Sequence, residues 1–246
     1  MTYIKSIGAY AIMLTSVFRR PQKRQIFREA VFKEIDDLGI KSIGIVAFIS
    51  FFIGGVVAIQ TALNLEDPMI PKDLIGFATK RSMILEFSST FVMVILAGKV
   101  GSYITSSIGA MRVSEQIDAL EVMGINSLNY LVLPKIIATV LFYPFIVLLA
   151  MTLGIFGGWV AGVVTGLFEQ QDYVSGIRID FDPSLIQYSL IKSVVFAFLI
   201  ATIPSYFGYY VKGGSLEVGR ASTNAVVWTI VMIIISNYFL TQMLLS

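Results

Sequence analysis

Three ionisable side chains, Glu86, Lys99 and Lys192, lie in stretches of sequence that are otherwise apolar. A charged side chain at the centre of a bilayer costs about 3 kcal/mol even on the lenient insertion scale, so such residues usually face a protein interior or a water-filled cavity. We expect these three either to form ion pairs that fix helix packing or to line a transport cavity. The sequence leaves open which lysine, if either, pairs with Glu86.

Few of the residue types that usually act in catalysis are present in this chain. The 246 residues include no Cys and no His, which excludes thiol nucleophiles, Cys/His zinc sites and imidazole acid–base catalysis. A Ser–Lys pair that uses Lys99 is conceivable, but the acids, lysines and serines are scattered over different segments. We therefore expect no catalytic residue, no metal site and no cofactor. An intramembrane enzyme and an ion or proton-coupled carrier remain the alternatives, although the chain has no ring of charge and no carbonyl-filter motif.

The composition indicates an integral membrane protein. Hydrophobic residues make up 56% of the chain and charged residues 14%, whereas soluble domains average about 25% charged residues. A membrane-spanning helix needs about 20 apolar residues. Segments of this kind cover residues 40–63, 74 to about 97 with a continuation to 110, 131–168, 185–207 and 225–245. The sequence thus predicts an all-α membrane protein.

The first 39 residues have a different character. Residues 1–18 carry apolar side chains at helical spacing, and Pro21 follows. This pattern predicts an amphipathic helix that lies in the membrane interface. Residues 19–38 begin with a basic cluster that includes Arg19, Arg20 and Lys23 and end with acidic residues, which favours a solvated helix over a lipid-specific site. We therefore divide the chain into an N-terminal interfacial and cytoplasmic helical segment, 1–39, and a transmembrane domain, 40–246.

The placement of Lys and Arg decides how often the chain crosses the membrane. The run 131–168 contains one charged residue, Lys135, and could form one long span or two spans with a tight turn at "GIFGG" (154–158). With one span, most of the 18 basic residues lie on the cytoplasmic side and the acidic loop 169–182 lies outside. Two spans would move this loop inside, against the usual bias. We predict five spans, with the N-terminus cytoplasmic and the C-terminus periplasmic.

Small residues recur every fourth position between residues 98 and 109. One row contains Gly98, Ser102 and Ser106, and the other contains Gly101, Thr105 and Gly109. Rows of this kind let helix backbones approach closely within a membrane. Packing within one chain and packing between subunits are both open interpretations.

The stretch "SEQIDALEVMG" (114–124) is polar and acidic between two apolar regions. On a helix, Glu115, Asp118 and Glu121 fall on one side, and Ile117 and Leu120 fall nearly opposite. We predict a short amphipathic helix on the cytoplasmic side, between the second and third spans. An acidic face binds poorly to an anionic leaflet. A surface that docks on a basic groove of a partner protein therefore explains the acids better than a helix that rests on lipid headgroups.

Three segments carry a resemblance to a known family. They read "GKVGSYITSSIGAMRVSEQIDALEVMGINSLNYLVLPKIIA" (98–138), "LIKSVVFAF" (190–198) and "GGSLEVGRASTNAVV" (213–227). They resemble the MlaE/YrbE permease family, the membrane subunits of MCE-type ABC lipid transporters, over roughly residues 26–246. In that family the acidic stretch resembles a coupling helix that sits in a cleft of the cytoplasmic ATPase. The resemblance implies that Glu115, Gln116, Asp118, Leu120 and Met123 form this docking element.

The resemblance also implies a function and a set of partners. The chain would be a non-catalytic permease subunit that moves phospholipid between the bacterial inner membrane and a periplasmic MCE-domain protein, a system tied to outer membrane lipid asymmetry. It has no GxxxxGK[ST] motif, so ATP hydrolysis would belong to separate ABC ATPase subunits. A homodimer is expected, with a small cytoplasmic accessory subunit as a further candidate partner and no nucleic acid. Candidate residues of the lipid cavity and of the intramembrane polar sites are Gln60, Leu63, Glu86, Lys99 and Lys192.

This sequence departs from the family pattern at several polar positions. Lys99 stands where the family usually has Arg, which keeps the charge but loses the planar fork of donors. Ser106 and Ser107 stand where an Ala-Glu pair is usual, so a salt bridge made by that acid is absent here. The departures concern the fine polar network and the choice of substrate rather than membership of the family.

Overall fold

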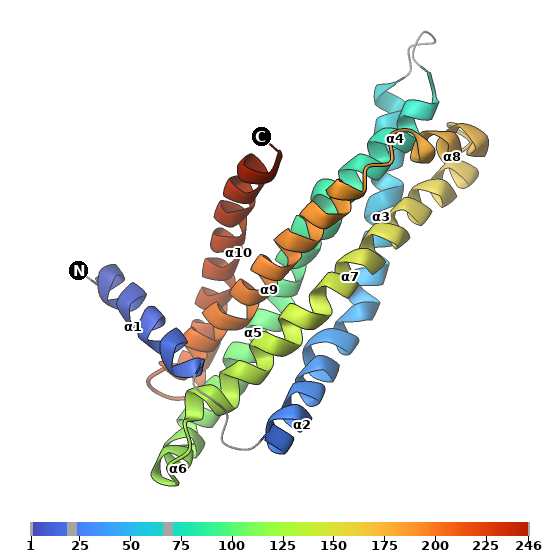
Figure 1. The fold of residues 1–246 in the computed structure, drawn as a ribbon. Helices are drawn as coiled ribbons and strands as arrows, with labels where there is room; N and C mark the ends of the chain where they lie inside the picture. Colours follow the sequence, from blue (N-terminus) through green and yellow to red (C-terminus); the bar gives the residue numbers. More distant parts are fainter. Residues whose placement is uncertain (1, 19–23, 66–70, 246) are drawn as a thin grey trace. The chain divides into compact units, whose positions relative to one another are not determined.

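The computed structural model describes residues 2–18, 24–65 and 71–245. Within these ranges every regular element is a helix (Figure 1). The elements are α1 (Thr2–Val17), α2 (Arg24–Glu34), η1 (Ile35–Ile40), α3 (Lys41–Asn64), α4 (Asp73–Ser82), η2 (Met83–Phe91), α5 (Val92–Val113), α6 (Gln116–Val122), α7 (Ser127–Thr165), α8 (Gln170–Arg178), α9 (Pro183–Tyr209) and α10 (Ser215–Leu245). The two η elements are π-helical and join the α-helices on either side of them without a break.

The predicted all-α membrane fold is confirmed. Five continuous helices in the described part of the chain are long and apolar enough to cross a membrane: Arg24–Asn64, Asp73–Val113, Ser127–Thr165, Pro183–Tyr209 and Ser215–Leu244. Several exceed the minimum length for a span because they extend through polar sequence at their ends. The short helices α1, α6 and α8 are not among the spans.

The first long helix begins earlier than the apolar sequence does. It starts at Arg24 and passes through η1 into α3, so no break separates residue 39 from residue 40. Within this join, Lys41 forms ion pairs with Asp36 and Asp37. Four residues of the N-terminal segment named above, Arg19, Arg20, Pro21 and Lys23, lie outside the described residues.

Helix α7 resolves the ambiguity of the longest apolar run. It is one helix of 39 residues, so "GIFGG" is not a turn. Its glycines instead permit close packing: a Cβ atom at Gly54 of α3 would lie 1.8 Å from the carbonyl oxygen of Gly154, and one at Gly157 would lie 1.9 Å from that of Phe51. No side chain fits at either distance. Glycine therefore lets the backbones of α3 and α7 touch, which compensates for the missing hydrophobic drive inside lipid.

The chain divides into two compact units, each composed of segments from several helices. The first unit contains the chain up to Lys41 together with Val94–Phe142 and Val195–Phe239. The second contains Ser42–Met93, Tyr143–Val194 and the residues from Leu240 onward.

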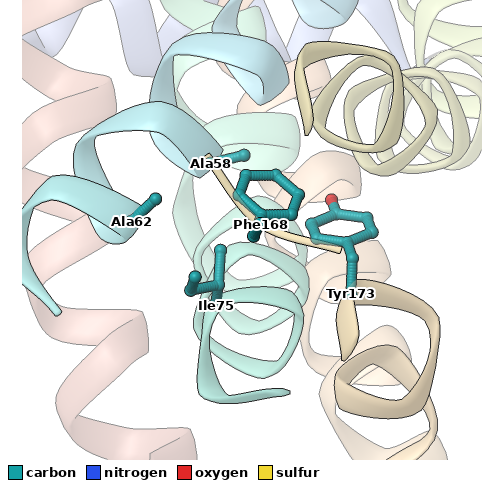
Figure 2. Close-up of a cluster of buried hydrophobic side chains, with 5 residues drawn as sticks. All are labelled: Ala58, Ala62, Ile75, Phe168 and Tyr173. Carbon is teal, nitrogen blue, oxygen red and sulfur yellow. The ribbon is translucent and has the colours of Figure 1, made fainter. Parts of the chain in front are cut away.

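In the second unit, a buried cluster joins the end of α3 to α4 and α8. It consists of Ala58, Ala62, Ile75, Phe168 and Tyr173, with the rings of the last two stacked at 5.4 Å (Figure 2). The Tyr173 hydroxyl donates a hydrogen bond to the carbonyl of Ile155, and burial raises the pKa of Tyr173. The cluster thus fixes the short helix α8 against the end of α3 and against α4, the first part of the second span.

In the first unit, one of the two small-residue rows packs within the chain. A Cβ atom at Gly101 would lie 3.2 Å from Pro204 of α9, and one at Gly109 would lie 2.9 Å from Val218 of α10. Thr105, between them in the row, donates a hydrogen bond to the carbonyl of Pro204. The other row differs, because a Cβ atom at Gly98 would meet nothing within 4 Å. The intramolecular interpretation therefore holds for the row of Gly101.

Candidate functional site

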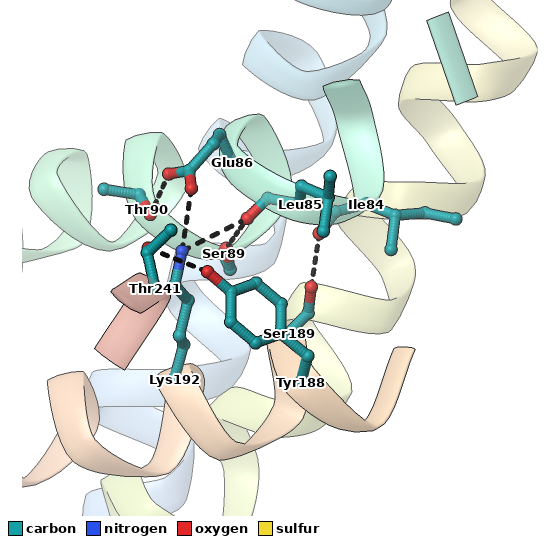
Figure 3. Close-up of polar contacts among 9 residues, drawn as sticks. All are labelled: Ile84, Leu85, Glu86, Ser89, Thr90, Tyr188, Ser189, Lys192 and Thr241. Carbon is teal, nitrogen blue, oxygen red and sulfur yellow. Dashed lines mark hydrogen bonds and ion pairs between the residues drawn. The ribbon is translucent and has the colours of Figure 1, made fainter. Parts of the chain in front are cut away.

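A polar cluster in the second unit joins η2 to α9 (Figure 3). The wide turns of a π-helix disturb the regular i→i−4 hydrogen bonding, so backbone carbonyls become available to other donors. Ser189 donates a hydrogen bond to the carbonyl of Ile84, and Lys192 Nζ lies 3.4 Å from the carbonyl oxygen of Leu85. Side chains of α9 thereby satisfy polar groups in a region where water is scarce.

Lys192 is the buried cation of this cluster. Its side chain has no exposed surface, and Nζ lies 2.8 Å from Glu86 Oε1. The ammonium group also lies 4.5 Å from the centre of the Tyr188 ring, a distance suited to a cation–π interaction. The Tyr188 hydroxyl in turn donates to Thr241 of α10 at 2.8 Å. The carboxylate, the carbonyl and the ring together compensate for the loss of water around Lys192.

Glu86 is the exposed side of the pair. Its side chain is 44% exposed, and Oε2 accepts a hydrogen bond of 2.9 Å from Thr90. The structure therefore identifies Lys192 as the lysine that pairs with Glu86. Lys99 belongs to the first unit, where its ammonium group donates to the carbonyl of Lys41.

Gln60 and Leu63 lie near the C-terminal end of α3 and are both exposed. Leu63 retains 50% of its accessible surface. Since both side chains are at the surface of the single chain, a lipid cavity that contains them needs a second surface opposite. Their assignment to such a cavity stays a prediction.

The acidic stretch forms α6, a helix of seven residues between α5 and α7 (Figure 1). Ile117 is fully buried, whereas Glu115, Gln116 and Asp118 are exposed. Leu120 is half-buried. Val122 and Met123 are apolar yet 89% and 65% exposed. The exposed surface of α6 is thus mixed, with an apolar end beside its polar residues, which is typical of a docking surface.

Two of the three acids of the predicted acidic face, Asp118 and Glu121, have partners within the first unit. Arg112 donates a hydrogen bond of 2.6 Å to Asp118. Glu121 Oε1 accepts hydrogen bonds from the hydroxyls of Tyr209, at 2.7 Å, and Ser127, at 2.9 Å. These two donors, Tyr209 first, lower the pKa of Glu121. The predicted acidic face is therefore divided, because Glu121 is directed toward α7 and α9.

Sequence reasoning did not identify Ser127 and Tyr209 as partners of α6. Tyr209 is 88 positions from Glu121, so no local pattern links the two. Arg112 and Ser127 were accessible signals, since each is only six residues from the acid that it contacts. The exposure of Val122 was also missed. An apolar residue in an amphipathic helix is normally expected on its buried side, but Val122 is exposed.

Comparison with known proteins gives a consistent picture. A family model described as "Permease MlaE" matches residues 31–243. A "Probable ABC transporter permease protein" of Rickettsia bellii is 34% identical over 97% of this chain and 92% of its own length. The "Intermembrane phospholipid transport system permease protein MlaE" of Haemophilus influenzae is 28% identical over 98% and 93%. The chloroplastic "Protein TRIGALACTOSYLDIACYLGLYCEROL 1" of Arabidopsis thaliana is 30% identical over 94% of this chain and 66% of its own length.

Proposed function

The chain belongs to the MlaE permease family and is a multi-pass ABC transporter permease, and from this premise we propose that it carries phospholipid between the inner membrane and a periplasmic MCE-domain partner. The Haemophilus influenzae relative is named as a permease of intermembrane phospholipid transport, which supports lipid as the cargo. The lone chain lacks the GxxxxGK[ST] sequence that would hold ATP phosphates. Energy therefore comes from a separate ABC ATPase, with which a small cytoplasmic accessory subunit associates.

The observation that carries the proposal is the surface of α6. A seven-residue helix between two spans exposes Glu115 and Gln116 together with the apolar side chains of Val122 and Met123. Apolar side chains with such large exposed fractions, on a short polar helix between two spans, indicate a surface that binds another protein. In the proposed complex α6 lies in the cytosol and inserts into a cleft of the ATPase. The N-terminus is then cytoplasmic and the C-terminus periplasmic.

The lipid cavity forms between two copies of the chain in this proposal. Gln60 and Leu63 are exposed on the single chain, and Glu86 presents 44% of its side chain. A second copy would supply the facing wall and exclude water from the lipid tails.

A double substitution on α6 tests the docking assignment. Val122→Asp with Met123→Asp should release the ATPase, since two charges would then enter an apolar contact, while the permease stays folded in the membrane. Val164→Asp is the matched control, because Val164 is 78% exposed but lies at the opposite end of α7. The measurements are co-purification of the ATPase and ATP-dependent lipid transfer. Retention of the ATPase by the double variant would refute the assignment.

A further inference from the structure

The contacts of Glu121 form a small network of three oxygen-bearing side chains, which we call the Glu121 cluster: Glu121, Ser127 and Tyr209. Both hydroxyls donate to the same carboxylate oxygen, and their own oxygens lie 2.9 Å apart. Hydrogen bonds to a charged acceptor are about twice as strong as those between neutral groups. The cluster is therefore a firm connection between α6, the first residue of α7 and the last residue of α9.

A second connection holds the first turn of α6. The Arg112 side chain, on the last turn of α5, pairs with Asp118 at 2.6 Å and lies 5.8 Å from the centre of the Tyr209 ring. One cation thus contacts both α6 and the residue of α9 that binds Glu121. Arg112 and Ser127, which contact the two acids of α6, both also contact Tyr209.

The residues that flank α6 have positive φ angles, so the position of α6 depends on the contacts that hold it. Glu115 has φ 58° and Gly124 has φ 74°. A non-glycine residue in the left-handed region costs about 1 kcal/mol, so the turn at Glu115 persists only if other contacts hold it. Within α6, the fully buried Ile117 supplies apolar contact, and Asp118 and Glu121 supply the polar ones.

We propose that the Glu121 cluster passes movement of α6 to α9, so that Glu121 and Tyr209 are positioning residues for transport and not part of the ATPase docking surface. The inference rests on the proposed function, since it requires an ATPase that moves α6. Helix α9 is the element that also contributes Lys192 to the polar cluster around Glu86. Tyr209 and Lys192 lie on the same helix, so a displacement of Tyr209 acts on the helix that carries the buried cation. Glu121 is itself exposed, and its assignment rests on the two hydrogen bonds that its carboxylate accepts.

The test uses the complete complex of permease, ATPase and periplasmic partner, reconstituted in vesicles that contain labelled phospholipid. Tyr209→Phe removes one hydroxyl, and Glu121→Ala removes the shared acceptor. Each should lower the lipid transported per ATP hydrolysed by about tenfold, the scale expected for a hydrogen bond to a charged group, while the ATPase stays bound. Glu121→Gln keeps an oxygen acceptor but loses the charge, so its loss of coupling should be intermediate between those of wild type and Glu121→Ala. Tyr210→Phe is the matched control, since Tyr210 is adjacent and its ring contacts Tyr209 at 5.2 Å.

The outcomes separate this inference from the function on which it rests. Unchanged lipid transport per ATP in both Tyr209→Phe and Glu121→Ala would overturn the inference, and so would loss of ATPase binding in these variants, because the cluster would then only maintain the docking surface. If Tyr209→Phe does not fold, Ser127→Ala and Glu121→Ala provide the same comparison. A wild-type chain that binds no ATPase, or a complex that moves no lipid, would instead refute the proposed function itself.

Discussion

The ion pair of Glu86 and Lys192 joins two residues in very different surroundings. Lys192 has no exposed surface, while the Glu86 side chain is 44% exposed. Removal of one member of a buried pair is costly because the other charge is left without compensation. The cost should therefore depend on which residue is removed, since only Lys192 is isolated from water.

This asymmetry gives a prediction at the residue scale. Glu86→Leu leaves a buried ammonium and should lower the free energy of unfolding by about 3 kcal/mol, whereas Lys192→Met leaves a partly hydrated carboxylate and should cost about 1 kcal/mol. The double variant should recover most of the loss. Thermal unfolding of the three purified variants in detergent measures the effect. Equal losses in both single variants would contradict the difference in burial.

At the scale of elements, the helices of the second unit depend on glycine contacts as well as on the ion pair. Gly54 and Gly154 face each other where α3 and α7 touch. Gly44 lies on the same helix α3, but a Cβ atom there would meet nothing within 4 Å. Gly44 and Gly54 thus lie on the same helix but differ in the space available for a Cβ atom.

We therefore expect the same substitution to have opposite consequences at the two positions. Gly54→Ala should separate α3 from α7 and destabilise the fold by about 2 kcal/mol, the scale of overpacking in a close contact. Gly44→Ala should be neutral or stabilise by up to about 1 kcal/mol, because alanine is the better helix former. Melting temperatures of the two variants provide the measurement. A tolerated Gly54→Ala would show that the helices can move apart at little cost.

The sequence predicted the elements better than it predicted their contacts. Hydropathy and the distribution of Lys and Arg identified five spans and favoured a single helix for 131–168, since both signals are local or additive along the chain. The π-helical segments were not predicted, because they depend on the partners of released carbonyls, such as Ser189. The hydrogen bond between Tyr209 and Glu121 was missed because the two residues are 88 positions apart.

At the scale of the whole molecule, the proposal assigns two tasks to different parts of one chain. In this proposal, exposed residues of α6 bind an ATPase, and residues along the spans hold lipid together with a second copy of the chain. Membership of the MlaE permease family and the full-length match to ABC transporter permeases support this division. Neither task requires chemistry from the permease, in agreement with a sequence that contains no His and no Cys.

The absence of cysteine makes the central claim directly measurable. Met123→Cys introduces the chain's single thiol on an exposed part of the helix α6 region. A short thiol-reactive crosslinker applied to inverted membrane vesicles should join position 123 to a subunit whose sequence contains GxxxxGK[ST], and the same reagent at Val164→Cys should not. An adduct with the ATP-binding subunit from position 164, or none from position 123 in vesicles that transport lipid, would contradict the account.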